Sequence, residues 1–144
     1  MNPFQSLRDC EEYVYSIQTQ CPRVSGSPLV LARRSSSLAV LQGELRFSEG
    51  HRLVVREYLN ADSNGVFIRR YSYEILRGQE KVTWFDSQPH PDAPDLASTH
   101  PHHRHIPPDI KHNRVPAPEI SFASPNLERI VAEVDRLTHT HGAR

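Results

Sequence analysis

The sequence predicts an α+β fold in which two amphipathic helices cover one face of an antiparallel sheet. Three observations lead to this prediction. Apolar residues recur every three or four positions near both ends of the chain, apolar residues alternate with polar ones in between, and the links between the alternating stretches are short and contain glycine. Each amphipathic helix needs an apolar partner, and one face of the sheet supplies it. The other face is left to solvent, to another segment or to a second copy of the chain.

The first helix is expected to begin at Pro3, because proline suits the first helical position, and to end at Pro22 and Gly26. The closing helix is expected to have Ser124 as its N-cap and Pro125 at its first position. Each helix carries one apolar stripe. The stripes are Phe4, Leu7, Cys10, Val14 and Ile17 in the first helix and Leu127, Ile130, Val131, Val134 and Leu137 in the second.

The stretch between the helices predicts about five strands. The expected strands cover residues 29–32, 39–47, 53–55, 67–75 and 82–85. Each of the links 48–50, 62–65 and 77–80 contains a glycine. Short links of this kind join neighbouring antiparallel strands as hairpins, so we expect a β-meander.

Length and composition bound the class of protein. A chain of 144 residues can bury one core, so we expect a single domain over residues 1–144, and the 17 basic and 17 acidic residues create no overall charge. Cys10 and Cys21 are too few for a disulfide scaffold and are expected to be reduced thiols. The N-terminus lacks a signal-peptide pattern, and no apolar run approaches the roughly 20 residues that span a bilayer. We therefore expect a cytoplasmic protein without a membrane partner.

Residues 87–118 differ in composition from the rest of the chain. They hold eight of the twelve prolines and few aliphatic residues, so neither a regular helix nor a central strand is expected there. Six of the nine histidines fall between residues 90 and 112. Histidine exchanges protons near neutral pH and is the commonest metal ligand. A long segment of this kind is either functional or disordered, and its histidines make it the candidate site.

One interpretation of this segment is general acid–base cleavage of RNA. That reaction needs a base for the 2′-OH proton, an acid for the leaving 5′-oxygen, and a cation near the charged transition state. Histidines 102, 103 and 105 could supply the acid and the base, and Arg104, Arg69 or Arg70 the cation.

A second interpretation is a metal site. His103 and His105, or His100 and His102, would be ligands, with His90 or Asp86 completing the shell. The spacing matches no established metal-binding signature. A third interpretation is a structural loop whose histidines hydrogen-bond main-chain carbonyls.

Arginine and aromatic residues are interleaved just before this segment. Arg69, Tyr71 and Tyr73 are expected on one face of a strand by the period-two rule, and Trp84 lies on the next strand. Such surfaces bind single-stranded RNA by stacking bases and pairing with phosphates. The same aromatic pairs also stabilise ordinary sheets.

Three short motifs together resemble the TumE family of toxin–antitoxin proteins. They are Arg-Tyr-x-Tyr at residues 70–73, aromatic-Asp-x-x-Pro-His at 85–90, and Pro-His-His-basic-His at 101–105. The resemblance runs from residue 5 to 137 and implies a toxin paired with a helix-turn-helix antitoxin. The family commonly has Asn and His where this chain has Ser87 and Pro91. Toxins of this size are frequently ribonucleases, which is an analogy and not a property of the motifs.

The sequence-based hypothesis is therefore a toxin that cleaves RNA without a cofactor. Its alternatives are a metal-dependent hydrolase, with zinc as one candidate metal, and a non-enzymatic module in which the segment binds a protein or pairs two copies as a homodimer. The predicted catalytic residues are His102, His103, His105, Asp86 and His90, with Asp86 or His90 orienting an imidazole. The predicted substrate-binding residues are Arg70, Tyr71, Tyr73, Trp84 and Arg104.

Overall fold

The structure is a computed structural model that describes residues 2–20, 24 and 28–142. It contains two α-helices, two 3₁₀-helices and seven strands in these residues. In chain order they are α1 (Leu7–Gln20), β1 (Val30–Arg33), β2 (Leu38–Arg46), η1 (Ser48–Gly50), β3 (His51–Asp62), β4 (Gly65–Arg77), β5 (Glu80–Asp86), η2 (Pro94–Thr99), β6 (His103–His105), β7 (Arg114–Pro116) and α2 (Leu127–Gly142). Cys21, Pro22 and Gly26 lie outside the described residues.

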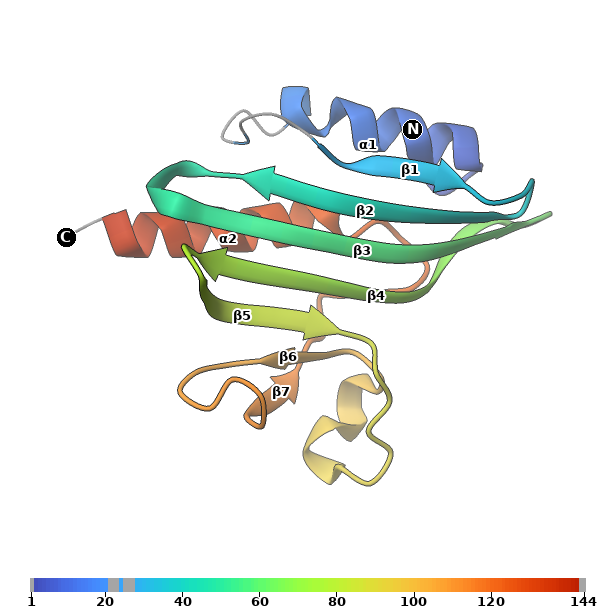
Figure 1. Cartoon of the computed structure of the whole chain (residues 1–144). Coiled ribbons are helices and arrows are strands. Elements are labelled where there is room, and N and C mark those ends of the chain that lie inside the picture. The colour runs from blue at the N-terminus through green and yellow to red at the C-terminus, as the bar shows by residue number, and fades with distance from the viewer. Residues whose placement is uncertain (1, 21–23, 25–27, 143–144) are drawn as a thin grey trace.

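All seven strands form one antiparallel sheet in the order β1-β2-β3-β4-β5-β6-β7 (Figure 1). The α+β class and the meander are confirmed, and the sheet has two more strands than expected. Short links join the expected strands. In the β3–β4 link, for example, the Asp62 carboxylate accepts the Asn64 backbone N–H at 2.8 Å, the local bond that favours aspartate in turns.

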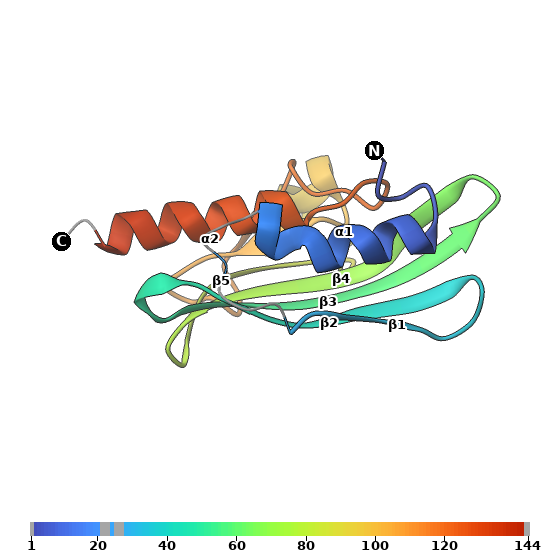
Figure 2. The same ribbon diagram turned by 90° about the horizontal axis from the view of Figure 1, so that it is seen from above.

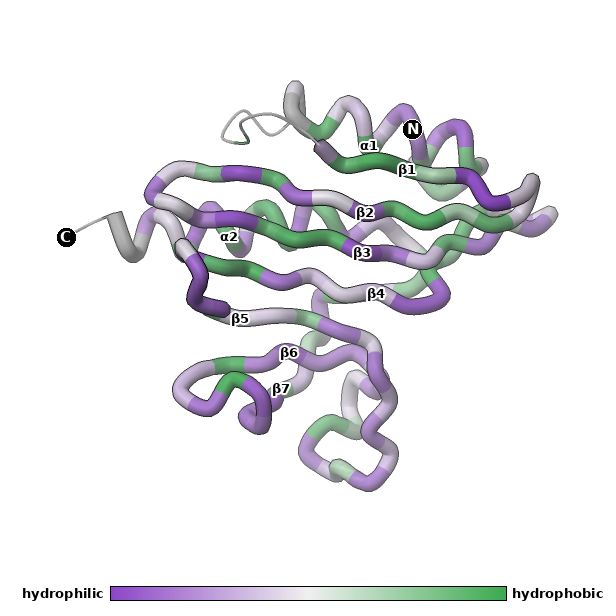
Figure 3. The backbone as a smooth tube through the Cα atoms, in the orientation of Figure 1, coloured by the Kyte–Doolittle hydropathy of each residue, from purple (hydrophilic) through white to green (hydrophobic). Residues whose placement is uncertain are grey.

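Both α-helices lie on the same face of the sheet, as predicted (Figure 2). The apolar residues of β3 that face them, Leu53, Val55 and Leu59, are all almost fully buried. Apolar residues are frequent in β1–β4, whereas the segment from β5 to β7 is mostly hydrophilic (Figure 3). We call the sheet face that α1 and α2 do not cover the open face. No helix in the described parts of the chain is long and apolar enough to cross a membrane.

Helix α1 begins four residues later than predicted. Its N-cap is Ser6, whose hydroxyl accepts the Asp9 backbone N–H at 3.1 Å, so Pro3 lies in the preceding turn. Phe4 also precedes the helix but is buried in the core, which explains why it fitted the apolar pattern.

Helix α2 begins at Leu127, and its N-cap is Asn126 in place of the expected Ser124. The Asn126 carbonyl accepts the Ile130 N–H at 3.0 Å, which is the first bond of the helix. The Asn126 side chain instead donates to the Tyr73 hydroxyl at 3.1 Å and to the Ser121 carbonyl at 2.8 Å. This asparagine therefore fixes the start of α2 to the core of the sheet.

The prediction that residues 87–118 contain no central strand was wrong. Strand β6 lies between β5 and β7, with His103 opposite Asp86 and His105 opposite Trp84. Prolines flank β6 but none lies within it, so its amides can join the ladder. Pro116 falls in β7, at the edge of the sheet, where a missing N–H is tolerated.

A β-bulge changes the expected face of one arginine. Tyr58 pairs with Arg70 and Leu59 pairs with Ile68, which leaves Arg69 as the extra residue of β4. Tyr71 and Tyr73 share a face, but it is the helix-covered one, and both are buried. Arg69 is exposed, so the prediction that it joins these tyrosines was wrong.

Candidate functional site

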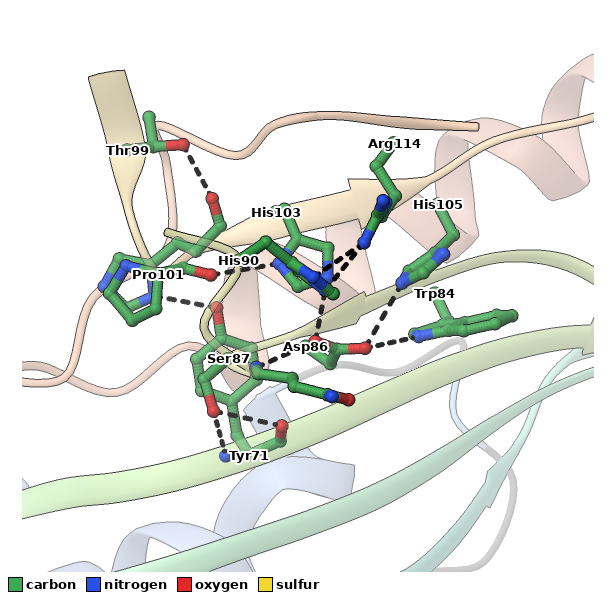
Figure 4. A network of polar contacts seen from close by, with 12 residues as sticks. Tyr71, Trp84, Asp86, Ser87, His90, Thr99, Pro101, His103, His105 and Arg114 are labelled. Atoms are coloured by element: carbon green, nitrogen blue, oxygen red, sulfur yellow. Dashed lines mark hydrogen bonds and ion pairs between the residues drawn. The ribbon is translucent and has the colours of Figure 1, made fainter. Parts of the chain in front are cut away.

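The candidate site lies at the end of the open face, where β5 meets β6. Asp86 is the last residue of β5, and His103 and His105 occupy alternate positions of β6, so both imidazoles project to the same side as Asp86 (Figure 4). Trp84 lies opposite His105 and completes the group. We call Asp86, His103 and His105 the histidine–carboxylate cluster.

The Asp86 carboxylate is the centre of the cluster. Oδ1 lies 2.9 Å from Nε2 of His103, and Oδ2 lies 3.2 Å from Nε2 of His105. The Trp84 indole N–H donates to Oδ2 at 2.8 Å, and the Gln88 backbone N–H donates to Oδ1 at 2.9 Å. Both oxygens are therefore fixed in orientation by β5 and the residues that follow it.

Each imidazole of the cluster is also fixed at its other nitrogen. Nδ1 of His103 lies 3.0 Å from the Pro101 carbonyl oxygen, and Nδ1 of His105 lies 2.9 Å from the Ile110 carbonyl oxygen. A carbonyl oxygen can only accept, so both Nδ1 atoms carry a hydrogen. Both Nε2 atoms consequently face the carboxylate.

The charges of the cluster support one another. Burial acts to raise the pKa of the Asp86 carboxyl, but its contacts with His103, His105 and Trp84 outweigh burial and hold that pKa well below its usual range. Burial acts to lower the pKa of His103, but the Asp86 carboxylate and the Pro101 carbonyl raise it above its ordinary value. Asp86 is thus an anion at neutral pH, and its presence favours positive charge beside it.

His90 and Arg114 cover one side of the cluster. The ring of His90 meets that of His103 edge to face, with centroids 4.9 Å apart, and Nη1 of Arg114 lies 2.8 Å from both ring nitrogens of His90. Partial burial and the Arg114 guanidinium lower the pKa of His90. A neutral imidazole therefore lies next to the cluster and is half-exposed.

Several predicted site residues lie away from the cluster. His102 points to the other side of the backbone, where its Nδ1 lies 2.8 Å from the Tyr71 hydroxyl. Tyr73 is fully buried and donates to Glu57, so its ring offers no surface to a base. Arg104 pairs with Glu133 of α2 and donates to Thr83 at 2.9 Å, which fixes β6 to the helix layer.

Two pockets border the cluster, and both are lined by Asp86 and Trp84. The arginine pocket, of about 760 Å³, extends over β3 and β4. Its cationic and aromatic lining is Arg56, Arg69, Arg70, Tyr58, Tyr71, Trp84 and Phe122. The histidine pocket, of about 450 Å³, lies on the other side and is lined by His90, His105 and three cations. Those cations are Lys81, Lys111 and Arg114.

Cations of both pockets lie on aromatic rings. In the arginine pocket the Arg70 guanidinium is 4.0 Å from the centroid of Tyr58, and in the histidine pocket Lys81 is 4.6 Å from the centroid of Trp84. Arg56 donates to the Tyr58 hydroxyl, a bond that lowers the pKa of Tyr58. Among the described residues no ion pair links Arg69 or Arg70 to a carboxylate. Their charge remains available to an anion.

Sequence reasoning missed Tyr58, Lys81, Lys111 and Arg114. Tyr58 follows Arg56 by two positions on a strand, the same arginine–aromatic alternation that drew attention to residues 69–73, and could have been found by it. Lys81, Lys111 and Arg114 come to the site because β5, β6 and β7 pair with one another. The local sequence contains no pattern that predicts this pairing.

In a comparison with protein families, residues 14–138, which are most of the chain, match the family model described as Toxin TumE. The chain belongs to the TumE family of toxins. No curated protein and no solved structure matches it. The matched region includes the whole histidine–carboxylate cluster, both pockets and most of α2. Membership in this toxin family confirms the resemblance and implies an antitoxin partner.

The two departures from the family motif now have positions in the structure. Ser87 is buried, and its hydroxyl accepts the Tyr71 backbone N–H at 3.0 Å, so it extends the contact between β5 and β4. Pro91 is exposed beside His90. Ser87 therefore has a structural contact of its own, directly after Asp86 in the chain.

Proposed function

We propose that this toxin is a ribonuclease that binds single-stranded RNA on the open face and cleaves it at the histidine–carboxylate cluster. One observation carries the proposal: two pockets lined by cations and aromatic rings meet at a cluster of imidazoles around one carboxylate.

The lining of the pockets is suited to a single strand of RNA. Bases stack on aromatic rings and on arginine guanidinium planes, and the pocket offers both at Tyr58 and Arg70. Phosphates pair with Lys and Arg; the arginine pocket contains three arginines, and the histidine pocket contains two lysines and one arginine. Six cations line the two pockets, although the chain as a whole carries no net charge; they are Arg56, Arg69, Arg70, Lys81, Lys111 and Arg114.

The histidine pocket contains the groups that transesterification of RNA requires. His90 and His105 reach the pocket and can exchange protons with the 2′-OH and the leaving 5′-oxygen. Lys111 and Arg114 can stabilise the charged transition state. His103 is almost fully buried and acts through its contact with Asp86. Of the predicted catalytic residues, His102 is the one that this proposal leaves out.

RNA binding by the arginine pocket predicts the effect of Arg70→Ala. Removing one phosphate contact should weaken binding of a single-stranded RNA about tenfold and reduce the slope of log K against log salt by about 0.7. Electrophoretic mobility shifts at several salt concentrations measure both. The matched control is Arg129→Ala, at an exposed arginine of α2 in the helix layer. An equal loss of RNA binding in both variants, or no loss in either variant, would count against the proposed binding face.

We propose that the antitoxin partner is a helix-turn-helix protein, as the family resemblance implies, and that the toxin acts in the cytoplasm, where its RNA substrate lies. Co-expression of the toxin with a neighbouring short helix-turn-helix gene should restore growth and yield a complex that survives size-exclusion chromatography. Size-exclusion chromatography of the toxin alone reports whether it is a homodimer.

A further inference from the structure

We propose that Asp86, His103 and His105 bind one divalent transition-metal ion, with zinc as the best match. The inference deepens the proposed function but can be tested without RNA. It rests on the direction of the donor atoms, the assignment of the ring hydrogens, and the chemistry of the donor set.

The three donor groups converge on one point. The two Nε2 atoms and one Asp86 oxygen lie within 4.8 Å of one another, close enough to share a single ion. The His103 Nε2 is completely buried and makes no aligned hydrogen bond, although Asp86 Oδ1 is only 2.9 Å away. A buried imidazole nitrogen without an aligned partner is rare in folded proteins and suggests an absent cation or proton.

The hydrogens on Nδ1 of His103 and His105 favour a metal ion, and not two protons, between the Nε2 atoms and the carboxylate. Since Nδ1 of both rings donates to a main-chain carbonyl, each neutral ring presents a lone pair to the carboxylate, which is repulsive. Protonating both rings would relieve this but would place two imidazolium ions, with centroids 5.0 Å apart, in a buried position. One divalent ion satisfies both lone pairs and the carboxylate together.

The surroundings match the outer shell of a metal site. Metal-bound histidines usually donate their second N–H to a carbonyl or carboxylate, as both histidines do here. The carboxylate is oriented by the indole of Trp84 and by the Gln88 amide. Ligating carboxylates in metal sites are hydrogen-bonded in this way.

The donor set selects the class of metal. Two imidazoles and one carboxylate suit zinc and other late first-row ions, and disfavour calcium and magnesium, which prefer oxygen. Three protein ligands leave a coordination position for water or a phosphate oxygen. His105 would then be a ligand, and His90, beside the cluster and half-exposed, would remain for proton transfer.

The test uses full-length protein purified without a His tag, stripped with a chelator and titrated with zinc by calorimetry. We expect one zinc per chain, with binding weakened about 100-fold or more in Asp86→Asn and in His105→Ala. The controls are His112→Ala and His100→Ala, which remove histidines of the same segment outside the cluster and should leave binding unchanged. No stoichiometric binding, or loss in the controls equal to that in the cluster variants, would overturn the proposal.

A second measurement keeps the test valid if a cluster variant fails to fold. In the wild-type protein, long-range ¹⁵N NMR of the histidines should show two Nε2 signals shifting with zinc while their Nδ1 atoms keep their hydrogens. Shifts in other histidines, or in none, would refute the site. RNA cleavage by a protein that binds no zinc would refute the metal site and keep the ribonuclease; zinc binding without RNA cleavage would do the reverse.

Discussion

Replacing Asp86 with asparagine should reduce RNA cleavage at least about 100-fold and should abolish toxicity. The amide keeps the size of the side chain, but its single oxygen can accept only one of the two N–H groups, of Trp84 and of Gln88, that donate to different oxygens of the carboxylate. It loses the negative charge that both imidazoles face, and it replaces one acceptor oxygen with a donor. The measurements are growth after induction and cleavage of a labelled single-stranded RNA by the purified variant.

The chain contains a matched control for this substitution. Asp109 also pairs with a histidine, His112, at 3.1 Å, but both side chains are largely exposed. Asp109→Asn should therefore leave toxicity unchanged. Circular dichroism and thermal unfolding check that both variants are folded. A folded Asp86→Asn protein that is as toxic as the wild type would remove the cluster from the mechanism.

The second large effect concerns stability and its dependence on pH. Glu57 is 2% exposed in the core, and burial raises its pKa from 4.5 to about 7, although the Tyr73 hydroxyl that donates to it acts in the opposite direction. The folded protein thus prefers the protonated carboxyl more than the unfolded chain does. This stabilisation is complete below pH 4.5 and is lost as the pH rises through 7.

The free energy of unfolding of Glu57→Gln should diverge from that of the wild type over this pH range. Glutamine cannot ionise, so the free energy of unfolding of the wild type should fall relative to the variant by about 3 kcal/mol between pH 5 and pH 9. Urea unfolding at a series of pH values measures the difference. Glu128→Gln, at an exposed glutamate of α2, is the control and should run parallel to the wild type. Parallel curves for Glu57→Gln would show that this carboxyl is not buried in the core.

Local patterns were sufficient to predict most of the fold. The stripes of α1 and α2 and the glycine-containing links between β2, β3, β4 and β5 are each encoded within a few residues, so they could be predicted from the sequence. Strands β6 and β7 have three residues each, too few to show a period, and they exist because β6 pairs with β5 and β7 pairs with β6. The many prolines of residues 87–118 led to the prediction that this segment has no central strand, although the prolines flank β6 and do not interrupt it.

The site was predictable in part for the same reason. Alternation along an extended backbone correctly placed His103 and His105 on one side, and Asp86 was among the proposed partners. Which face of β4 is buried could not be decided locally. Tyr73 was therefore predicted to bind substrate, whereas it donates to Glu57 in the core.

The most direct test of the account is an NMR titration of ¹⁵N-labelled protein with a short single-stranded RNA carrying 2′-O-methyl groups, which cannot supply the attacking hydroxyl. The chain has one tryptophan, so Trp84 gives a single indole signal, and its N–H donates to Asp86. We predict that this signal and the backbone amides of Arg70 and His105 shift most. Shifts confined to α1 and α2, with the Trp84 indole unmoved at saturating RNA, would contradict a site on the open face.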